Sequence, residues 1–474
     1  MSLNIAHLAA EKDYAHFDLY RLRESGGWQI DFVNLTAFLH ERGFFIHRIN
    51  INKHVYIRIV DNIVKEVGKV DIKKEILDFI INEKNRSVHE FFIKNINKAT
   101  ADEFLETLDC KEINFRKDTK KYIDFYFENC IARITADGVE EIPYKNLIGY
   151  IWESQIIQRQ FKRVPENPKQ TGDFKKFCWN ISNKDQNRYN SICSTLGFLI
   201  HNYKNPVYCP AIILNDEVIS DNPEGGTGKG LLIKAVQQFS RTINIEGKTF
   251  SFEKSFLYQR VNADTKIICF QDVNKSFDFE RLFSVLTDGI EVEKKGVGSV
   301  MIEFEESPKI VITTNYAIRG DGNSHERRRF ELEISQYYNS KLTPITEFKK
   351  VMFKEWNAQE WSKFDNFIID CCQFYLRMGL VKQELIHLEQ KRLMAETSKD
   401  FIDFMEIFDF ETIRKSEIYD NFLREYSEYI KHKWFTKQKM STWISAYARF
   451  KGYTVTDYIY LSERYYKFEL LQSL

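Results

Sequence analysis

The stretch Glu224-Gly-Gly-Thr-Gly-Lys-Gly230 decides the fold of this chain, and the apolar run Leu231-Leu-Ile-Lys-Ala-Val236 follows it directly. Glycines allow a loop to turn its backbone N–H groups inward, and the start of a helix adds partial positive charge. The pattern therefore predicts a phosphate-binding loop, with Lys229 reaching the β- and γ-phosphates of a nucleotide. A plain flexible turn is the alternative. The expected ligands are Gly225, Gly226, Thr227, Gly228, Lys229 and Gly230.

The loop departs from the usual pattern G-x-x-x-x-G-K-[ST] at two positions. Pro223 stands in place of the first glycine, and Gly230 replaces the Ser or Thr whose hydroxyl binds Mg²⁺. A substitute acid would come from one of four nearby carboxylates, namely Asp216, Glu217, Asp221 and Glu224. The motif thus indicates nucleotide binding more directly than hydrolysis.

Two apolar segments downstream end in polar residues, as buried strands of α/β proteins do. Ile267-Ile-Cys-Phe270 ends in Gln271-Asp272, and Ile310-Val-Ile312 ends in Thr313-Thr-Asn315. A P-loop enzyme places at such strand ends an acid that directs Mg²⁺ or water, and an amide that touches the γ-phosphate. We therefore expect Asp272 to direct metal or water, with Gln271 beside it, and Asn315 to contact the γ-phosphate.

The cluster Arg327-Arg-Arg-Phe330 follows the second of these segments. An arginine stabilises the charge that develops in phosphoryl transfer, and it can come from a neighbouring subunit. Taken singly, a strand ending in Asp, a Thr-Thr-Asn turn and a surface arginine cluster are all common. Their order within about a hundred residues, the length of one α/β nucleotide domain, favours a single site.

On these residues, the region from about 205 to 335 resembles the ATPase core of superfamily 3 helicases, especially the replicative helicases of phages, plasmids and large DNA viruses. The resemblance implies a P-loop AAA+-like fold that binds ATP and Mg²⁺. It also implies that Asn315 ends the sensor strand and that the arginine finger lies among Arg327, Arg328 and Arg329, with Arg328 preferred. The family assembles as rings, and we expect a homo-hexamer.

The same family carries a β-hairpin between the acidic and sensor strands, and the lysine at its tip binds DNA in the central channel of the ring. Residues 290–295 and 299–304 alternate in polarity and flank a glycine-containing turn, which is typical of a hairpin. The resemblance therefore implies that Lys294 and Lys295 contact single-stranded DNA. One departure concerns the acidic strand, because the family usually has two adjacent acids where this chain has Gln271-Asp272. A glutamine amide cannot accept a proton from water or balance the charge of Mg²⁺.

Composition places few limits on function. The chain has 474 residues, with 68 Lys+Arg balanced by 68 Asp+Glu, so any DNA-binding field must be local. Its eight cysteines form no C-x-x-C pair, which favours a reducing compartment and argues against a zinc ribbon. No apolar window is long enough to cross a bilayer, and the acidic N-terminus does not read as a signal peptide. We expect a cytoplasmic protein.

The pattern predicts an α/β chain of five parts. Residues 1–172 form an α+β N-terminal region of unknown role, without the paired acids of a primase. Residues 173–204 form a helical collar-like segment, 205–340 the ATPase core and 341–399 a helical segment. A helix is expected to begin at Asp71, which would cap it, and another segment of helical spacing runs from Phe348 to Met378. Residues 122–127 and 130–135 are expected to pair as a hairpin.

The last part, 400–474, has a winged-helix order: two amphipathic helices, at 415–426 and 439–450, then two alternating strands. From Lys431 to Lys451 the sequence has six Lys/Arg and no Asp or Glu. We expect Lys437, Lys439 and Arg449 to contact phosphates of duplex DNA, although a solvated helix face is the alternative. Trp434 and Trp443 are expected in the core.

The resulting hypothesis is an ATP-dependent replicative DNA helicase or ring translocase of a phage or mobile element. One alternative is a nucleotide-binding initiator or scaffold that has lost hydrolysis, which Gly230 and Gln271 favour. Another is a P-loop ATPase that remodels protein instead of DNA.

Overall fold

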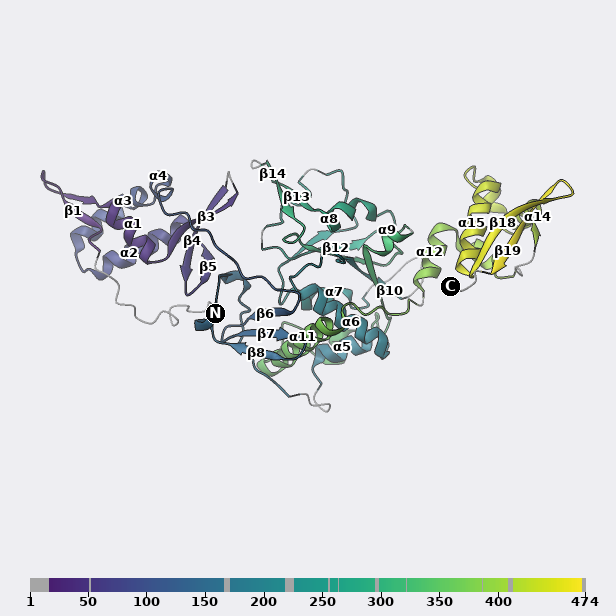
Figure 1. Ribbon diagram of the computed structural model, residues 1–474, viewed down its shortest axis with the longest axis horizontal. Coiled ribbons are helices and arrows are strands. Elements are labelled where there is room, and N and C mark those ends of the chain that lie inside the picture. The colour runs from purple at the N-terminus through teal and green to yellow at the C-terminus, as the bar shows by residue number, and fades with distance from the viewer. Residues whose placement is uncertain are drawn as a thin grey trace. The chain divides into compact units, whose positions relative to one another are not determined.

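Two units make up the chain, and they meet in the sequence between Lys162 and Arg163. The computed structural model describes residues 17–50, 53–165, 171–217, 226–254, 256–262, 264–294, 298–320, 322–385, 387–407 and 412–470 (Figure 1). Gly225, Asp221, Glu224 and Lys295 lie outside the described residues.

The first unit combines helices with three small sheets. The strands pair as β1–β2, as β3-β4-β5-β9 and as the meander β6-β7-β8. In chain order the elements are β1 (Tyr20–Leu22), β2 (Trp28–Ile30), α1 (Phe32–Glu41), β3 (Phe44–Asn50), β4 (Lys53–Val60), β5 (Ile63–Glu66), α2 (Lys69–Asn82), α3 (Arg86–Ala99), α4 (Asp102–Leu105), β6 (Tyr122–Tyr126), β7 (Ile131–Thr135), β8 (Val139–Ile142) and β9 (Ile151–Trp152).

Local sequence explains most of these elements. The expected hairpin is present, because β6 and β7 pair antiparallel from Tyr122↔Thr135 to Tyr126↔Ile131. The prediction for Asp71 was wrong by one turn. Gly68 is the N-cap of α2, and Asp71 lies three residues further on, where its carboxylate accepts the Gly68 N–H at 2.8 Å. The acid still satisfies a free backbone donor at the helix start, which is why the sequence signal was strong.

The second unit is built on a five-stranded parallel sheet in the order β11-β12-β15-β10-β16. The β-strands β10, β12 and β15 are almost completely buried, so they read as continuous apolar runs. Its elements are α5 (Asp173–Ile181), α6 (Gln186–Ile200), β10 (Ala211–Asp216), α7 (Lys229–Val236), β11 (Thr242–Glu246), β12 (Ile267–Val273), α8 (Phe283–Thr287), β13 (Gly289–Lys294), β14 (Gly298–Glu303), β15 (Lys309–Thr314), α9 (Asn323–Glu326), β16 (Arg329–Ile334), α10 (Pro344–Phe348), α11 (Ala358–Met378) and α12 (Leu388–Glu396).

Helices distant in sequence pack beside this sheet. α11 packs against α5 and α6 (Figure 1), and Gly197 allows the close approach, because a Cβ there would lie 2.5 Å from the Cys371 carbonyl oxygen. The expected helix from Phe348 to Met378 was too long. The chain turns at Lys349 and Phe353, which both have positive φ, and α11 begins only after its Asn357 N-cap.

Residues 399–470 have their own core within the second unit. The elements are α13 (Lys399–Met405), β17 (Ile413–Arg414), α14 (Lys415–Glu425), α15 (Lys437–Phe450), β18 (Tyr453–Tyr460) and β19 (Glu463–Leu470), with the strands in the order β17-β19-β18. Phe401, Phe422, Trp443 and Tyr447 form the centre of this core. The two expected helices and the closing hairpin are therefore present, and β17 adds a short third strand.

Candidate functional site

The candidate site lies where three neighbouring parallel strands end. β15 pairs with β10 on one side and with β12 on the other, so the carboxyl ends of all three meet at one edge of the sheet. Hydrogen bonds join these ends: the Thr313 hydroxyl accepts the Asp272 N–H at 2.9 Å, and the Thr314 hydroxyl donates to the Val273 carbonyl at 3.0 Å. In open α/β sheets this edge is where ligands bind.

Lys229 lies at the centre of the candidate site. It is the first residue of α7, and its ammonium lies 2.6 Å from Asp216 Oδ1 and 2.6 Å from Asn315 Oδ1. The Thr227 hydroxyl donates to the same Asp216 oxygen. Lys229 and Asp216 are both buried, with relative exposures of 7% and 4%. The structure thus brings together Thr227, Lys229 and Asn315: Asp216 joins Thr227 to Lys229, and Lys229 contacts Asn315.

Burial controls the charge of this lysine. Desolvation lowers the pKa of the Lys229 ammonium, and the Asp216 and Asp272 carboxylates oppose that shift. A buried charge without a partner would be costly, and the ion pair with Asp216 offsets part of that cost.

The glycines of the loop differ in what they require. Gly226 and Gly228 have φ values of 84° and 112°, which only glycine adopts readily. A Cβ on Gly228 would also lie 2.7 Å from the Phe177 ring. Gly230 is different, because a Cβ there would meet nothing within 4 Å. Packing around a Cβ is therefore not the reason that residue 230 lacks a side chain.

Asp272 has a strained backbone. Its φ is 51°, and the pairing of β12 with β15 shifts register between Phe270 and Val273, so Gln271 and Asp272 form a bulge. Left-handed non-glycine residues and bulges concentrate at functional sites. The bulge leaves the Asp272 side chain exposed at the edge of the sheet, while Gln271 is half-buried.

The other candidate acids are placed differently from Asp216. Glu217 forms an ion pair with Arg188 at 2.9 Å, so its carboxylate already has a cationic partner other than Lys229. Asp221 and Glu224 lie outside the described residues. Sequence reasoning treated Asp216 only as one of four candidates, because nothing local distinguishes it. It missed Lys391, whose ammonium donates to the Asp216 carbonyl from α12.

The three arginines lie at the opposite edge of the sheet. β16 runs parallel to β10, with Arg329 beside Ala211 at one end and Ile334 beside Asp216 at the other. Arg329 is buried and paired with Glu331 at 2.9 Å, so it is committed to its own chain. Arg328 is half-buried; it donates to the Ser324 carbonyl at 3.0 Å and lies over the Phe283 ring. Arg327 is exposed.

The expected β-hairpin is present as β13 and β14, which pair antiparallel from Gly289↔Glu303 to Lys294↔Gly298. Ile290 and Val292 are buried in the core cluster that also contains Ile268 and Ile310. Lys294 ends β13, and Lys295, at the tip, is outside the described residues.

The basic residues near the C-terminus are partly as expected. Lys437 and Arg449 are exposed at the two ends of α15, and Lys439 is half-buried, with its ammonium 5.9 Å from the centre of the Trp443 ring. Trp443 is buried, as predicted. The prediction for Trp434 was wrong, because its side chain is 54% exposed and stacks on His432.

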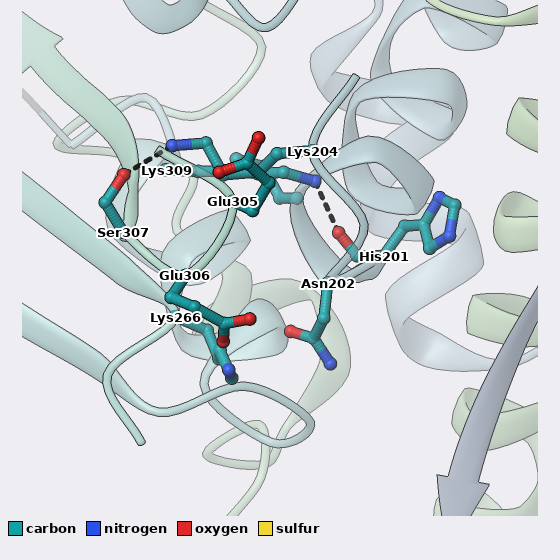
Figure 2. Close-up of a pocket in the computed structure, with 9 residues that line it drawn as sticks. His201, Asn202, Lys204, Lys266, Glu305, Glu306, Ser307 and Lys309 are labelled. Carbon is teal, nitrogen blue, oxygen red and sulfur yellow. Dashed lines mark hydrogen bonds between the residues drawn. The ribbon is translucent and has the colours of Figure 1, made fainter. Parts of the chain in front are cut away.

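A pocket lies at the amino ends of β12 and β15, away from Lys229 (Figure 2). There the Lys309 ammonium donates to the carbonyls of Phe198 and His201 at the end of α6, which satisfies free helix carbonyls. The Lys204 ammonium donates to the Ser307 hydroxyl at 2.6 Å, and burial lowers the pKa of Lys204 to about 8. These contacts join the helix to the sheet and so serve the fold.

Among the described residues, no helix combines the length and the apolar character that crossing a bilayer demands. The described part of the chain also has no cluster of three His, Cys, Asp or Glu side chains of the kind that binds a metal without further ligands.

Comparisons with solved structures find distant likenesses. No family model matches the chain, and no curated protein matches it. Two apo structures of the NrS-1 C-terminal region are similar, at 13% and 17% identity, with TM-scores of 0.39 and 0.42. Each covers 92% of this chain, and the match spans 99% and 98% of those chains. JCV helicase, solved with a bound small molecule, is similar at 15% identity and a TM-score of 0.27, over 49% of this chain and 63% of that one. TM-scores below 0.5 do not establish a shared fold, so the proposals below rest on the residues of the chain itself.

Proposed function

We propose that the chain is an ATP-dependent DNA helicase or ring translocase of the replicative type. The observation that carries the proposal is the Lys229 ammonium, held between Asp216 and Asn315 at the carboxyl edge of a parallel sheet. It stands at the N-terminus of α7, where free N–H groups and the helix dipole favour an anion. The β- and γ-phosphates of ATP would replace the carboxylate and amide oxygens that now surround Lys229.

The residues present fit Mg²⁺ if water completes its coordination. Mg²⁺ usually takes one or two carboxylates together with substrate phosphates and keeps several waters. Asp272 offers an exposed carboxylate at the correct edge, and Asp216 lies on the other side of β15. Bound there, Mg²⁺ would neutralise charge on the transferring phosphate. Asn315 would contact the γ-phosphate, and the Gln271 amide would donate to or accept from the attacking water.

The distance along β16 favours a role for Arg328 at the nucleotide of a neighbouring subunit. β16 has six residues, at about 3.3 Å per residue, so Arg328 and a nucleotide on Lys229 lie about 20 Å apart along the strand. Arg328 therefore serves the nucleotide of the next copy, in a head-to-tail contact that closes as a ring. A hexamer is the ring size we propose.

DNA contact is assigned to two places. The hairpin tip, with Lys294 and Lys295, would hold a single strand in the channel of the ring. The exposed basic residues of α15 would contact duplex phosphates, so that affinity falls steeply with salt. Lys437→Ala and Arg449→Ala should each lower the salt slope by about one and weaken binding without regard to sequence.

The experiment that tests the function is DNA-stimulated ATP hydrolysis by the purified chain. Lys229→Ala should abolish hydrolysis and nucleotide binding. Lys234→Ala is the matched control, because Lys234 is exposed on the same helix, five residues later. Hydrolysis that survives Lys229→Ala would exclude this site. Strand displacement that survives alanine at both Lys294 and Lys295 would exclude the hairpin from DNA movement and favour a protein-remodelling ATPase.

A second candidate is a nucleotide-binding replication initiator that does not hydrolyse ATP. It is favoured by Gly230, which lacks the metal-binding hydroxyl, and by Gln271, which stands where the resembling family has an acid. The two functions separate in one comparison. Nucleotide binding without turnover, with turnover appearing in Gln271→Asp, would favour the initiator.

A further inference from the structure

Helix α12 carries a buried lysine to the back of the candidate site. The Lys391 side chain is 7% exposed, and its ammonium donates to the Asp216 carbonyl and lies 3.5 Å from Asn215 Oδ1. Asn215 and Asp216 are the last two residues of β10, and Asp216 holds Lys229. Two lysines from distant parts of the chain therefore contact the same strand end, one at its carboxylate and one at its backbone.

The chain around Lys391 is fastened to the edge strand β16. Gln383 donates to the Glu333 carbonyl at 3.2 Å, and the His387 N–H donates to the Glu333 carboxylate at 3.0 Å. Arg392 forms an ion pair with Glu331 at 2.5 Å. Because β16 lies beside β10, all these contacts hold α12 at the corner of the sheet where the phosphate loop begins.

The other face of α12 belongs to a different core. Leu393 is buried, and with Met394 it packs into the core of residues 399–470, which includes Trp443. α12 packs directly against α15, the helix that presents Lys437 and Arg449. One helix of nine residues thus contacts the candidate phosphate site and the candidate duplex-binding helix.

We propose that α12 couples occupancy of the phosphate loop to the DNA-binding face of α15, with Lys391 as the positioning residue. The inference rests on the proposed nucleotide site. A bound phosphate would draw the Lys229 ammonium away from the Asp216 carboxylate. That carboxylate would then lack its cationic partner, and the nearby Lys391 ammonium, which already contacts the backbone of Asp216, would shift in response. A short helix moves as a rigid body, so a shift of Lys391 is passed to the side chains that pack on α15. Such coupling is reciprocal: DNA on α15 must change nucleotide affinity by the same factor.

The test uses the full chain, a fluorescent DNA duplex and fluorescence anisotropy, with and without a non-hydrolysable ATP analogue and Mg²⁺. The duplex Kd of the wild type should change by about fivefold or more when the analogue is added. Lys391→Met should reduce that change to less than about twofold, while its nucleotide-free duplex Kd stays within about twofold of wild type. Lys391→Arg should restore the response. Lys382→Met, an exposed lysine nine residues earlier, should respond as the wild type does.

The outcomes separate the coupling from the function. If the wild type binds both ligands but neither changes the affinity of the other, or if Lys391→Met responds normally, the coupling is refuted and the nucleotide site stands. If the wild type binds no nucleotide, both fail. If Lys391→Met does not fold, Arg392→Gln is the second variant. It removes the ion pair between α12 and Glu331, and the Arg392 side chain is 22% exposed, so the substitution disturbs the core less. A full response in Arg392→Gln would then overturn the proposal.

Discussion

Replacing Gly228 with alanine should destabilise the phosphate loop strongly. Its φ of +112° disfavours any residue with a Cβ, and the added methyl would lie 2.7 Å and 2.9 Å from two carbons of the Phe177 ring. Phe177 is fully buried in α5, so the ring has no free space to enter. The left-handed backbone costs an alanine about 1–2 kcal/mol, and overpacking adds about 1–3 kcal/mol. The expected loss in the free energy of unfolding is about 2–5 kcal/mol.

Two other glycines of the same loop are matched controls. Gly226 has a φ of +84° but open space around its Cβ position, so alanine there should cost only the backbone part, about 1–2 kcal/mol. Gly230 is helical, with nothing within 4 Å of its Cβ position, so alanine should stabilise by up to about 1 kcal/mol. One added methyl group therefore has three different predicted effects within five residues.

Urea unfolding of the full chain, followed by circular dichroism and tryptophan fluorescence, measures the three changes. Binding of a fluorescent ATP analogue is the second assay. Of the three variants, Gly228→Ala should weaken this binding most, since the substitution displaces Lys229. The reasoning is refuted if Gly228→Ala unfolds within about 0.5 kcal/mol of wild type. It is also refuted if Gly230→Ala is the more destabilising variant.

Three further predictions concern charge. Because burial lowers the pKa of Lys204 to about 8, from 10.5, the unfolded chain binds more protons than the folded chain between these values. Stability should therefore rise with pH in this window by on the order of 2–3 kcal/mol, and Lys204→Met should remove that rise in urea titrations at pH 8 and pH 10. Arg328→Ala should abolish ATP hydrolysis without loss of stability and should regain activity when mixed with Lys229→Ala subunits. Arg329→Ala should instead destabilise by about 1.5–3 kcal/mol, because it removes one of the two arginines paired with the Glu331 carboxylate, whose side chain is 4% exposed, and leaves only Arg392. Asparagine tolerates the left-handed backbone of residue 272, so Asp272→Asn should unfold like the wild type. It should lose about 100-fold in the rate of hydrolysis and lose the dependence of that rate on Mg²⁺. An unchanged rate would show that Asp272 does not bind the metal.

Sequence predicts those parts of the fold that depend on nearby residues. The apolar runs that end at Asp272 and Asn315, the glycine loop and the two closing strands were all visible in short windows, because burial and turn chemistry leave local patterns. The failures are also physical. The chain between Phe348 and Asn357 has helical spacing, but two residues with positive φ interrupt it, and they are not glycines. Trp434 is a large aromatic residue of the kind usually found in a core, yet it lies at the surface, where it stacks on His432.

The contacts of the candidate site also divide into those that nearby sequence predicts and those that it does not. Lys229 could be predicted from its motif, and Asn315 from its strand. Asp216 could not be singled out, since its role depends on an 11-residue span of chain that returns Thr227 to the end of β10. Lys391 contacts Asp216 across 175 residues, and a lysine on a mostly polar helix has no sequence feature that indicates burial.

Under the proposed nucleotide binding, the pair of Asp216 and Lys229 would also limit which anions the loop binds. Lys229 is already neutralised by a carboxylate of its own chain, so a single inorganic phosphate or sulfate would exchange one weak anion for another and gain little. A triphosphate with its metal brings several charges and can reach the helix N-terminus, Lys229 and Asn315 together. In the proposed site the resident carboxylate would thus act as a competitor that is always present, and it would make the site selective by the number of charges a ligand carries.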